Sequence, residues 1–399
     1  MKILHIVDYA GPHGGLYQIL RVLARELADT PIEQDYLALE KTPYKLDPAL
    51  VTLPMRTLSG QTYETALTEA APDIVHIHTD LSNERLRFTR DHFYTIRTVH
   101  DLGAFCPRTG FDTAYCPVDP LFTEPRDERF IDQICTPCSE IGTDGRARYF
   151  ERIDLLRSLP AIQCLSDGVM DYLLEMGIKR DVITKVPPLL AAPPASPAPT
   201  SHTIMFAGRM VEHKGVRELL EALAILPPNT DWRLRLAGTG ERAYVRSLMR
   251  LAAVRGIKAK VEFLGHVPYE EYLDLYRDAR LMVMPSIYAE GFGYTAYEAL
   301  LYGVPIISFQ EILGVNEWLR HGYNGLMVSF GDVPALASAI NSVLTNEELH
   351  TKLRRNSVRW ARRIRAADEV SVMRRAYEKA YQGSRELMSL GNGPDTTMR

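Results

Sequence analysis

The stretch MPSIYAEGFGYTAYEAL, residues 284–300, decides how this sequence is interpreted. An apolar run at 281–284 leads into it and predicts a buried strand. Gly291 and Gly293 then predict a loop whose backbone N–H groups can approach a ligand, and a helix is expected to begin near Thr295. Because the start of a helix adds unpaired N–H donors and the positive end of a dipole, the segment predicts a cradle for a phosphate or carboxylate.

Two glutamates flank this glycine loop. Glu290 stands just before the glycines, and Glu298 lies roughly one turn inside the expected helix. We expect the Glu290 carboxylate to reach a neutral, hydroxyl-rich group beside the phosphates, and the Glu298 carboxylate to reach a ribose diol. The alternative is a loop glutamate and a solvated helix glutamate without any ligand, and the strand, glycines and helix around them argue against it.

Short apolar runs alternate with longer amphipathic segments on both sides of this stretch. The alternation is typical of parallel sheets covered by helices. Strands are expected in the first half at 3–7, 73–78, 95–100 and 161–166, and in the second half at 203–207, 232–237, 261–264, 281–284, 304–308 and 325–328.

Length and local composition divide the chain. A chain of 399 residues is too long for one ordinary core. Residues 191–200 are so rich in proline that they can form neither a helix nor a central strand, and they are expected to be a linker. We therefore predict an α/β protein with two Rossmann-like domains, residues 1–190 and 201–360, that face each other across a cleft. A helix at 361–385 is expected to cross back to the first domain.

Composition and charge exclude several classes of function. The net charge of −4 gives no reason to expect a nucleic acid as partner. The apolar run after Met1 ends at Asp8, far short of a signal peptide, and no apolar stretch approaches the ~20 residues of a membrane span. The protein is therefore expected to be cytoplasmic, where cysteines are thiols or metal ligands more often than disulfides.

Two basic residues follow the expected strand at 203–207. Arg209 and Lys214 then lie beyond the carboxyl end of a parallel strand, where ligands bind in open sheets of this kind. A guanidinium offers a planar fork of donors to phosphate oxygens, and an ammonium offers a mobile point charge. Two exposed surface residues are the alternative, and the nearby carboxylate motif makes a phosphate site the better interpretation.

Glu290 and Glu298, with Gly-Phe-Gly between them and Gly303-Val304-Pro305 after them, resemble the E-x7-E signature of the retaining glycosyltransferases of family four, or group 1. The resemblance implies the GT-B fold, in which a first domain binds the acceptor and a second domain binds a nucleotide-sugar donor. In that family, the arginine and lysine that match Arg209 and Lys214 hold the donor diphosphate and offset the charge of the leaving nucleotide. Glu290, Arg209, Lys214 and His100 are the implied catalytic residues.

The resemblance also implies further residues of the donor site. His266 and Val267 match the place of the nucleotide base, and His100 matches a histidine that reaches the donor sugar, although a histidine at a strand end is often structural. Val315 stands where the family usually has the second glycine of a Gly-Gly-x-x-Glu stretch, which leaves that backbone contact open. The other implied donor-binding residues are Gly14, Gly15, Gly208, Gly240, Gly291, Phe292, Gly293, Tyr294, Thr295 and Glu298.

Four cysteines gather in an expected insertion at 103–145. Cys106, Cys116, Cys135 and Cys138 follow the spacing C-x9-C-x18-C-x2-C. Four thiols this close in sequence could form a structural zinc site, and the insertion resembles one found in a subset of the family. Unligated thiols and disulfides are the alternatives, because the first pair lacks the short spacing of a zinc ribbon.

Arg85, Arg87, Arg90 and Arg97 are interleaved with aromatic residues. This pattern could form a basic, aromatic face for a peripheral contact with a membrane. Acidic residues in the same segment dilute it, so a solvated helix face is favoured.

Together these features predict a retaining glycosyltransferase that requires no cofactor for catalysis. No two aspartates are separated by a single residue, so the metal-binding D-x-D of the other transferase architecture is absent. Positive side chains, loop N–H groups and helix dipoles must then stabilise the leaving diphosphate. The expected donor is UDP- or GDP-linked. The expected acceptor is a sugar or a lipid-linked glycan of polysaccharide or glycolipid biosynthesis, at the inner face of the membrane.

Two other functions stay open on the same fold. A nucleotide-sugar epimerase or an inverting transferase would act on the same donor, and the inverting enzymes need a general base in the first domain. A nucleotide-sugar-binding protein without turnover is the second alternative. The complete set of Arg209, Lys214, Glu290 and Glu298 speaks against it.

Overall fold

The structure is a computed structural model, and it divides into two compact units that are described separately. The first unit comprises Met1–Leu190 and Ala366–Arg399, and the second comprises Ala191–Arg365. The residues that the structure describes are 1–9, 14–40, 53, 55–58, 60–107, 119, 121, 123, 126–135, 142–190, 199, 201–310, 312–363 and 366–389.

The first unit is built on a seven-stranded parallel sheet in the order β3-β2-β1-β4-β5-β6-β7. The strands at its centre are almost entirely buried, as expected where helices cover both faces of a sheet, although they carry several polar side chains. The strands are β1 (Lys2–Tyr9), β2 (Glu33–Glu40), β3 (Met55–Thr57), β4 (Ile74–Ile77), β5 (Tyr94–Val99), β6 (Ala161–Cys164) and β7 (Ile183–Lys185).

The helices of the first unit include one that follows the second unit in the chain. This helix, α14 (Ala366–Ser389), packs on α1, β4 and β5. Side-chain caps begin several of the others; Ser166, for example, accepts a hydrogen bond from the backbone N–H of Val169 at the start of α7. The helices are α1 (Gly14–Glu26), α2 (Tyr63–Ala70), α3 (Asn83–His92), α4 (Glu128–Phe130), α6 (Gly142–Arg157) and α7 (Asp167–Glu175).

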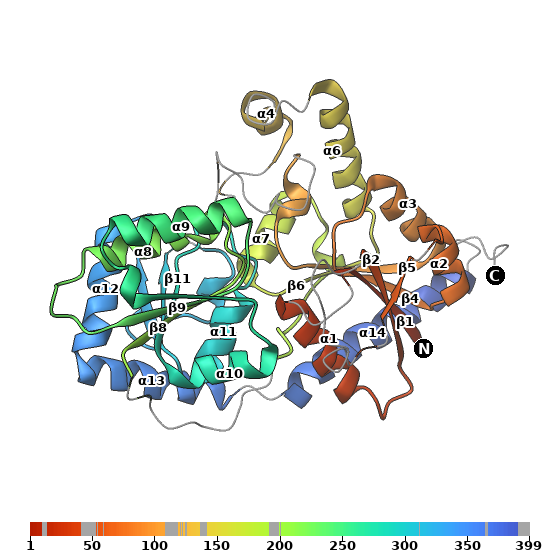
Figure 1. Ribbon diagram of the computed structural model, residues 1–399. Helices are drawn as coiled ribbons and strands as arrows, with labels where there is room; N and C mark the ends of the chain where they lie inside the picture. The colour runs from red at the N-terminus through yellow and green to blue at the C-terminus, as the bar shows by residue number, and fades with distance from the viewer. Residues whose placement is uncertain are drawn as a thin grey trace. The chain divides into compact units, whose positions relative to one another are not determined.

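The second unit repeats this plan with a six-stranded parallel sheet in the order β10-β9-β8-β11-β12-β13. In Figure 1, α8 and α9 lie on one side of this sheet, and α10 and α11 lie on the other. The strands are β8 (Thr203–Ala207), β9 (Arg233–Ala237), β10 (Val261–Gly265), β11 (Ala279–Met284), β12 (Ile306–Phe309) and β13 (Gly325–Val328). The helices are α8 (Val216–Ala224), α9 (Arg242–Val254), α10 (Tyr269–Asp278), α11 (Tyr294–Leu301), α12 (Val333–Thr345) and α13 (Glu347–Ala361).

Both sheets reverse the direction of strand addition once. The reversal falls between β1 and β4 in the first sheet and between β8 and β11 in the second. Connections leave such a pair of strands toward opposite faces, so a crevice opens at their carboxyl ends, where ligands bind in open α/β sheets. The residues after β8 and β11 are therefore the first place to look for a site in the second unit.

The strands expected from the sequence are all present, and their ends lie within two residues of the expected positions. The sequence did not predict β2, β3 and β7. In β2, charged residues at both ends obscure the apolar centre, and β3 and β7 are short strands at the two edges of the sheet. Among the helices that the structure describes, none is both long and apolar enough to cross a membrane.

Candidate functional site

Two loops meet at the carboxyl ends of β8 and β11. The first runs from Gly208 to Gly215, where α8 begins, and the second runs from Pro285 to Gly293, where α11 begins. Gly215 has a left-handed φ of +69°, and a Cβ atom built on it would lie 1.8 Å from the carbonyl oxygen of Pro285. Only glycine allows this approach, because any side chain at position 215 would collide with the second loop. Gly215 therefore permits the two loops to pack closely.

An ion pair joins these two loops. The Lys214 ammonium donates to Glu290 Oε1 at 2.6 Å and to the Tyr288 hydroxyl at 2.7 Å. The pair is largely shielded from water, because the two side chains are only 18% and 9% exposed. Lys214 also lies over the Tyr288 ring, 4.8 Å from its centroid, so a cation–π contact adds to the pair.

Further donors converge on Glu290. Ser286 Oγ donates to Oε1 at 2.7 Å, and the Tyr288 hydroxyl donates to Oε2 at 2.7 Å. Burial acts to raise the pKa of Glu290, but the Lys214 charge and the hydrogen bonds from Lys214, Ser286 and Tyr288 outweigh it, and the pKa of this carboxyl lies below its usual value. Glu290 is therefore an ionised carboxylate in fixed orientation at neutral pH.

The glycine loop after Glu290, predicted to be an anion cradle, leads directly into the N-terminus of α11. Gly293 caps α11 with a left-handed φ of +78°, so the first N–H groups of the helix point out of its N-terminus. A second loop packs against this turn: the Gly314 N–H donates to the Glu290 carbonyl at 2.9 Å, and a Cβ on Gly314 would lie 2.0 Å from the Gly291 carbonyl oxygen. Val315, which departs from the family pattern, is fully buried and begins a short 3-10 turn.

Glu298 occupies a separate, tyrosine-lined position on α11. Tyr269 donates to Oε1 at 2.6 Å and Tyr276 donates to Oε2 at 3.0 Å, both from α10. Burial raises the pKa of Glu298, and the two tyrosine hydroxyls partly offset that rise. Each carboxylate oxygen keeps a further lone pair, so each can accept one more hydrogen bond. The ribose contact of Glu298 stays a prediction.

The other predicted residues of the second unit follow neighbouring strand ends. Arg209 is exposed just after β8, and His266 is exposed just after β10. The turn at Gly240 runs beside Met210, where a Cβ on Gly240 would lie 2.0 Å from the Met210 carbonyl oxygen. Thr295 Oγ1 donates to the Ala207 carbonyl at 3.1 Å, which joins the start of α11 to the end of β8. The roles of these residues in donor binding stay predictions.

In the first unit, His100 follows β5 and is half-buried. Its Nε2 lies 3.2 Å from Nδ1 of His78, and burial, followed by the Arg97 charge, lowers the pKa of His100 to about 3. Gly14 and Gly15 begin α1, whose preceding loop, 10–13, is outside the described residues.

The cysteine cluster is described only in part. Cys106 and Cys135 are buried in the first unit, and Cys116 and Cys138 lie outside the described residues. Tyr149 and Tyr172 lie close to both described cysteines: burial first, and then these two thiols among other groups, raise the pKa of each tyrosine. The zinc site stays a prediction.

The four arginines considered as an alternative basic face do not form one. Arg97 is on β5, is 6% exposed and pairs with Asp80. Arg87 on α3 pairs with Glu151 on α6, and Arg90 pairs with its neighbour Asp91. The pattern combined residues of a helix with an inward-facing residue of a strand, so the less favoured interpretation, a single face of four arginines, does not hold.

Sequence reasoning also missed the residues that hold the two glutamates. Ser286 and Tyr288 lie inside the quoted motif, but the sequence does not show that their hydroxyls turn back onto Glu290. Tyr269 and Tyr276 are seven residues apart and therefore share one face of α10. That spacing was a readable signal that the two could act on one partner.

Comparisons with known proteins show what the sequence is similar to. Residues 193–360 match the sequence model of the family "Glycosyl transferases group 1". Exopolysaccharide phosphotransferase SCO2592 of Streptomyces coelicolor is 32% identical over 49% of this chain and 21% of its own length. The lipopolysaccharide core biosynthesis glycosyltransferase LpsE of Rhizobium meliloti is 30% identical over 51% of this chain and 60% of its own length. The chain thus spans less than two thirds of these curated relatives.

The fold as a whole is similar to that of solved structures. Anabaena Alr3699/HepE, solved in complex with UDP and glucose, has a TM-score of 0.72 at 17% identity, over 95% of this chain and 99% of that one. Two parallel sheets of this strand order, matched along nearly the whole chain, define the class: the protein has the GT-B fold. Within that class, its second unit is similar to the group 1 glycosyl transferases, whose sequence model residues 193–360 match.

Proposed function

We propose that the protein is a retaining glycosyltransferase, which moves a sugar from a nucleotide-diphosphate sugar to an acceptor without a catalytic metal ion. The proposal rests above all on the Lys214–Glu290 pair, which is held at the carboxyl ends of β8 and β11 beside the glycine cradle of α11. A cation and a helix N-terminus suit a diphosphate, and an ionised carboxylate beside them suits the hydroxyl groups of an attached sugar.

The leaving diphosphate would be stabilised electrostatically. Lys214 and Arg209 would supply positive charge, and the N–H groups after Gly291 and the α11 dipole would supply further donors. In the described structure Lys214 is bonded to Glu290, so a bound diphosphate would share the ammonium with the carboxylate. This scheme needs no divalent ion, and the sequence has no D-x-D to hold one.

Glu290 would position the sugar. Its fixed orientation and ionised state suit a carboxylate that accepts hydrogen bonds from sugar hydroxyls. In the retaining reaction proposed, the bond from the anomeric carbon to the phosphate oxygen breaks through an oxocarbenium-like state. The acceptor oxygen attacks the same face, and its proton passes to the departing phosphate oxygen. Glu290 is therefore not a covalent nucleophile, in contrast to retaining hydrolases.

The names of the relatives suggest the biological setting. LpsE is a lipopolysaccharide core glycosyltransferase, and HepE was solved with UDP and glucose. The proposed donor is therefore a UDP- or GDP-linked sugar. The proposed acceptor is a sugar or a lipid-linked glycan of cell-surface polysaccharide or glycolipid biosynthesis, reached at the inner face of the membrane.

A two-stage experiment tests the proposal. UDP- and GDP-sugars are screened for thermal stabilisation of the protein, and the best donor is then assayed for sugar release and for transfer to simple glycan acceptors. We expect transfer that Lys214→Ala abolishes and Lys260→Ala preserves. Lys260 is a matched control: it also donates a hydrogen bond and lies over an aromatic ring, but it precedes β10 at the opposite end of the sheet. Donor binding without turnover, or epimerisation without transfer, would contradict the proposal.

A further inference from the structure

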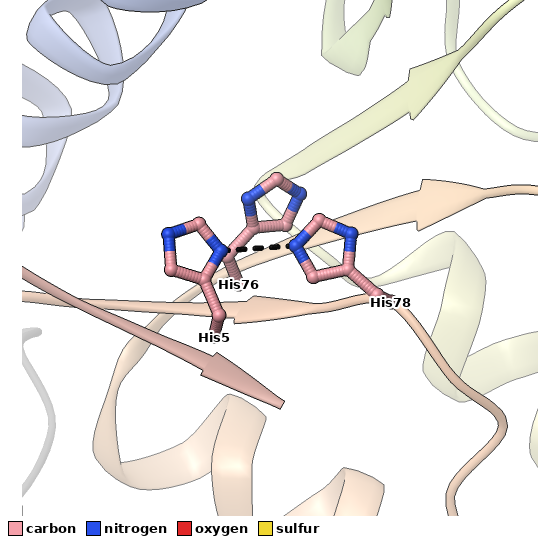
Figure 2. A group of neighbouring side chains, drawn as sticks. All are labelled: His5, His76 and His78. Carbon is pink, nitrogen blue, oxygen red and sulfur yellow. Dashed lines mark hydrogen bonds between the residues drawn. The ribbon is translucent and has the colours of Figure 1, made fainter. Parts of the chain in front are cut away.

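Three histidines form a buried group in the first sheet. His5 on β1 pairs in register with His76 on β4, and His78 lies two residues further along on the same face; we call these three the histidine layer (Figure 2). One nitrogen from each lies within 4.8 Å of the others, close enough for a metal site. However, both nitrogens of His76 are bonded, to the Tyr377 hydroxyl at 2.8 Å and to the Thr98 hydroxyl at 2.7 Å, and Nδ1 of His5 lies 3.0 Å from Nε2 of His78. A metal ion would have to break these bonds, so we assign no ligand to the histidine layer.

Helix α9 in the second unit carries an unusual distribution of charge. Its 13 residues, Arg242–Val254, include three arginines and neither aspartate nor glutamate. Arg242, Arg246 and Arg250 follow one another at intervals of four residues, so they are neighbours along one exposed face of the helix. Like charges at this spacing destabilise a helix, whereas an ordinary solvated helix places acidic residues between them. The arrangement is therefore unfavourable for the chain alone, and an anionic partner would stabilise it.

The three arginines of α9 have no partner within the chain. Among the residues that the structure describes, none forms an ion pair or a hydrogen bond with their guanidinium groups. Arg255, which follows the helix, is different, because it pairs with Glu221 on α8 at 2.7 Å. The exposed Glu241 stands at the N-cap of α9. One carboxylate cannot neutralise three guanidinium groups, so this surface keeps a net positive charge.

Exposed apolar side chains border the arginines. Val254 is 75% exposed and Met249 is 42% exposed, and at about 3.6 residues per turn they flank the row of arginines on its two sides. Ile225, at the end of α8, is 57% exposed. In Figure 1, α8 and α9 lie side by side, and the ion pair between their last turns places Ile225 at the same end as Val254. Among the described residues, the one other exposed large apolar side chain is Leu174 of the first unit.

These residues together make one surface, which we call the α9 face. It consists of Arg242, Arg246, Met249, Arg250, Ala253 and Val254. We propose that the α9 face docks on a membrane surface that contains anionic lipids. The guanidinium groups contact lipid phosphates, and the flanking apolar side chains enter the boundary between headgroups and acyl chains. The apolar side chains favour a membrane over a nucleic acid, whose backbone offers phosphates without an apolar layer beside them.

The α9 face begins beside the candidate site. Helix α9 starts directly after the turn at Gly240, and a bridge between Met210 and Gly240 joins this turn to the loop that carries Arg209 and Lys214. A membrane on the α9 face therefore passes close to the edge of the sheet where the candidate site lies. That position suits an acceptor whose lipid end stays in the bilayer. This consequence rests on the proposed function, and the membrane contact itself does not.

Sedimentation of the full chain with lipid vesicles tests the contact. Vesicles of equal parts phosphatidylglycerol and phosphatidylcholine should bind the protein, and vesicles of phosphatidylcholine alone should bind it far more weakly. Binding to the anionic vesicles should fall as the salt concentration rises, because salt screens the arginine charges. Equal binding to both kinds of vesicle, or binding to neither, would overturn the proposal.

A triple variant tests the arginines. Arg242→Gln, Arg246→Gln and Arg250→Gln, made together, should weaken binding to the anionic vesicles about a hundredfold, since each arginine near such a surface contributes about fivefold. All three positions are exposed, so the variant should unfold at the wild-type temperature or slightly above it, as circular dichroism would show. Wild-type vesicle binding by the folded variant would overturn the proposal.

A matched control removes the same charge from another helix. Lys352, Arg355 and Arg359 are exposed on α13, but the exposed Glu348 lies one turn before Lys352, and no large apolar side chain is exposed beside them. Replacement of these three cations by glutamine should leave vesicle binding near the wild-type level. An equal loss of binding in the two triple variants would overturn the α9 face, because binding would then follow net charge alone.

The apolar side chains need a test of their own. Met249→Ser with Val254→Ser should weaken vesicle binding severalfold at low and at high salt, because salt does not screen apolar burial. Unchanged binding in this double variant would overturn their entry into the bilayer, and tighter binding of the wild type to single-stranded RNA than to anionic vesicles would overturn the choice of a membrane. If the wild type binds vesicles but transfers no sugar, the proposed function fails while the membrane contact stands.

Discussion

Lys214 and Glu290 depend on each other, because each places a charge where little water can reach it. The lysine is 18% exposed and the carboxylate 9%, and Ser286 and Tyr288 complete the shell around the carboxylate. Loss of either charge leaves the other unpaired in a poorly solvated site, which costs more than loss of an exposed ion pair. Arg209, which is exposed, has no comparable burial.

Because Lys214 is largely shielded from water and Arg209 is exposed, their alanine variants should differ in stability although both lose turnover. Lys214→Ala and Arg209→Ala should each reduce kcat about a hundredfold or more, because each removes charge that stabilises the leaving diphosphate. Lys214→Ala should also lower the free energy of unfolding by about 3 kcal/mol, since Glu290 is left unpaired, and Arg209→Ala by much less. Steady-state kinetics and urea unfolding measure both effects, with Lys260→Ala as the control. Near-normal rates in both variants would contradict the assignment of Lys214 and Arg209 to the donor site.

The two glutamates should differ in the step that they affect. Glu290→Gln should depress turnover strongly and leave free-nucleotide binding nearly unchanged. Glu298→Gln should weaken nucleotide binding itself, by about 1.5–3 kcal/mol, the worth of a hydrogen bond to a charged group. Calorimetric titration with nucleotide and kinetics with the donor distinguish the two, and Glu262→Gln, on the exposed part of β10, is the control. The E-x7-E interpretation fails if both variants lose only nucleotide affinity or if neither changes.

The sequence was enough to name the charged residues of the candidate site, but it did not predict which side chains contact them. Glu290, Lys214 and Arg209 lie beyond strand ends and next to glycines, which are local signals. The turn of Ser286 and Tyr288 onto Glu290 depends on how two loops distant in sequence pack together. His78 and His5 escaped notice for a different reason: they lie within apolar strands, where a single histidine looks like an ordinary core residue.

At the scale of elements, the site depends on close approach between loops. The loop before α8 touches the loop after β11 at Gly215, and the loop of Gly314 touches the glycine turn before α11. These contacts hold the loops against one another just beyond the carboxyl ends of β8 and β11, which are paired within the sheet. The positions of Lys214 and Glu290 follow from them.

A pair of glycines with similar backbone conformations tests this dependence. Gly215 has a φ of +69° and Gly256 a φ of +74°, but a Cβ on Gly215 would meet the Pro285 carbonyl, whereas a Cβ on Gly256 meets nothing within 4 Å. Gly256→Ala should cost about 1 kcal/mol of stability and leave activity intact. Gly215→Ala should cost clearly more and also lower kcat, as unfolding curves and a turnover assay would show. Equal stabilities and activities in the two variants would contradict the packing argument.

Strand prediction succeeded where burial on both faces makes a strand continuously apolar, as in β8 and β11. It failed for β2 because charged residues at its ends mask the buried centre Tyr36-Leu37-Ala38. Helix α14 was expected from its composition, but its cover of the histidine layer, through Tyr377 and His76, links residues 301 positions apart. No local pattern could predict that contact.

At the scale of the whole molecule, buried titratable groups make stability depend on pH. His5 and His100 have a pKa of about 3 in the folded protein against an ordinary value of 6.5. As the pH falls below 6.5 the unfolded chain binds protons that the folded protein excludes, so these groups lower stability down to about pH 3. Glu369, whose pKa burial raises to about 7 from 4.5, acts in the opposite direction between those two values.

His5→Gln isolates one contribution to this dependence. The variant lacks one group that must stay neutral, so the stability deficit relative to wild type should shrink by about 1.4 kcal/mol per pH unit as the pH falls below 6.5. Urea unfolding at pH 7, 6 and 5 measures the difference. Tyr377→Phe, whose hydroxyl has a pKa well above 10.0, should show a constant deficit. A His5→Gln deficit that does not change with pH would contradict a neutral, buried His5.

The configuration of the transferred sugar tests the central claim most directly. The purified protein is incubated with its best nucleotide-sugar donor and an acceptor in excess chelator, and the anomeric configuration of the new linkage is determined by NMR. The account predicts the configuration of the donor, formed at an undiminished rate by the wild type and far more slowly by Glu290→Gln. An inverted linkage, or a product that forms only when a divalent metal ion is restored, would contradict it.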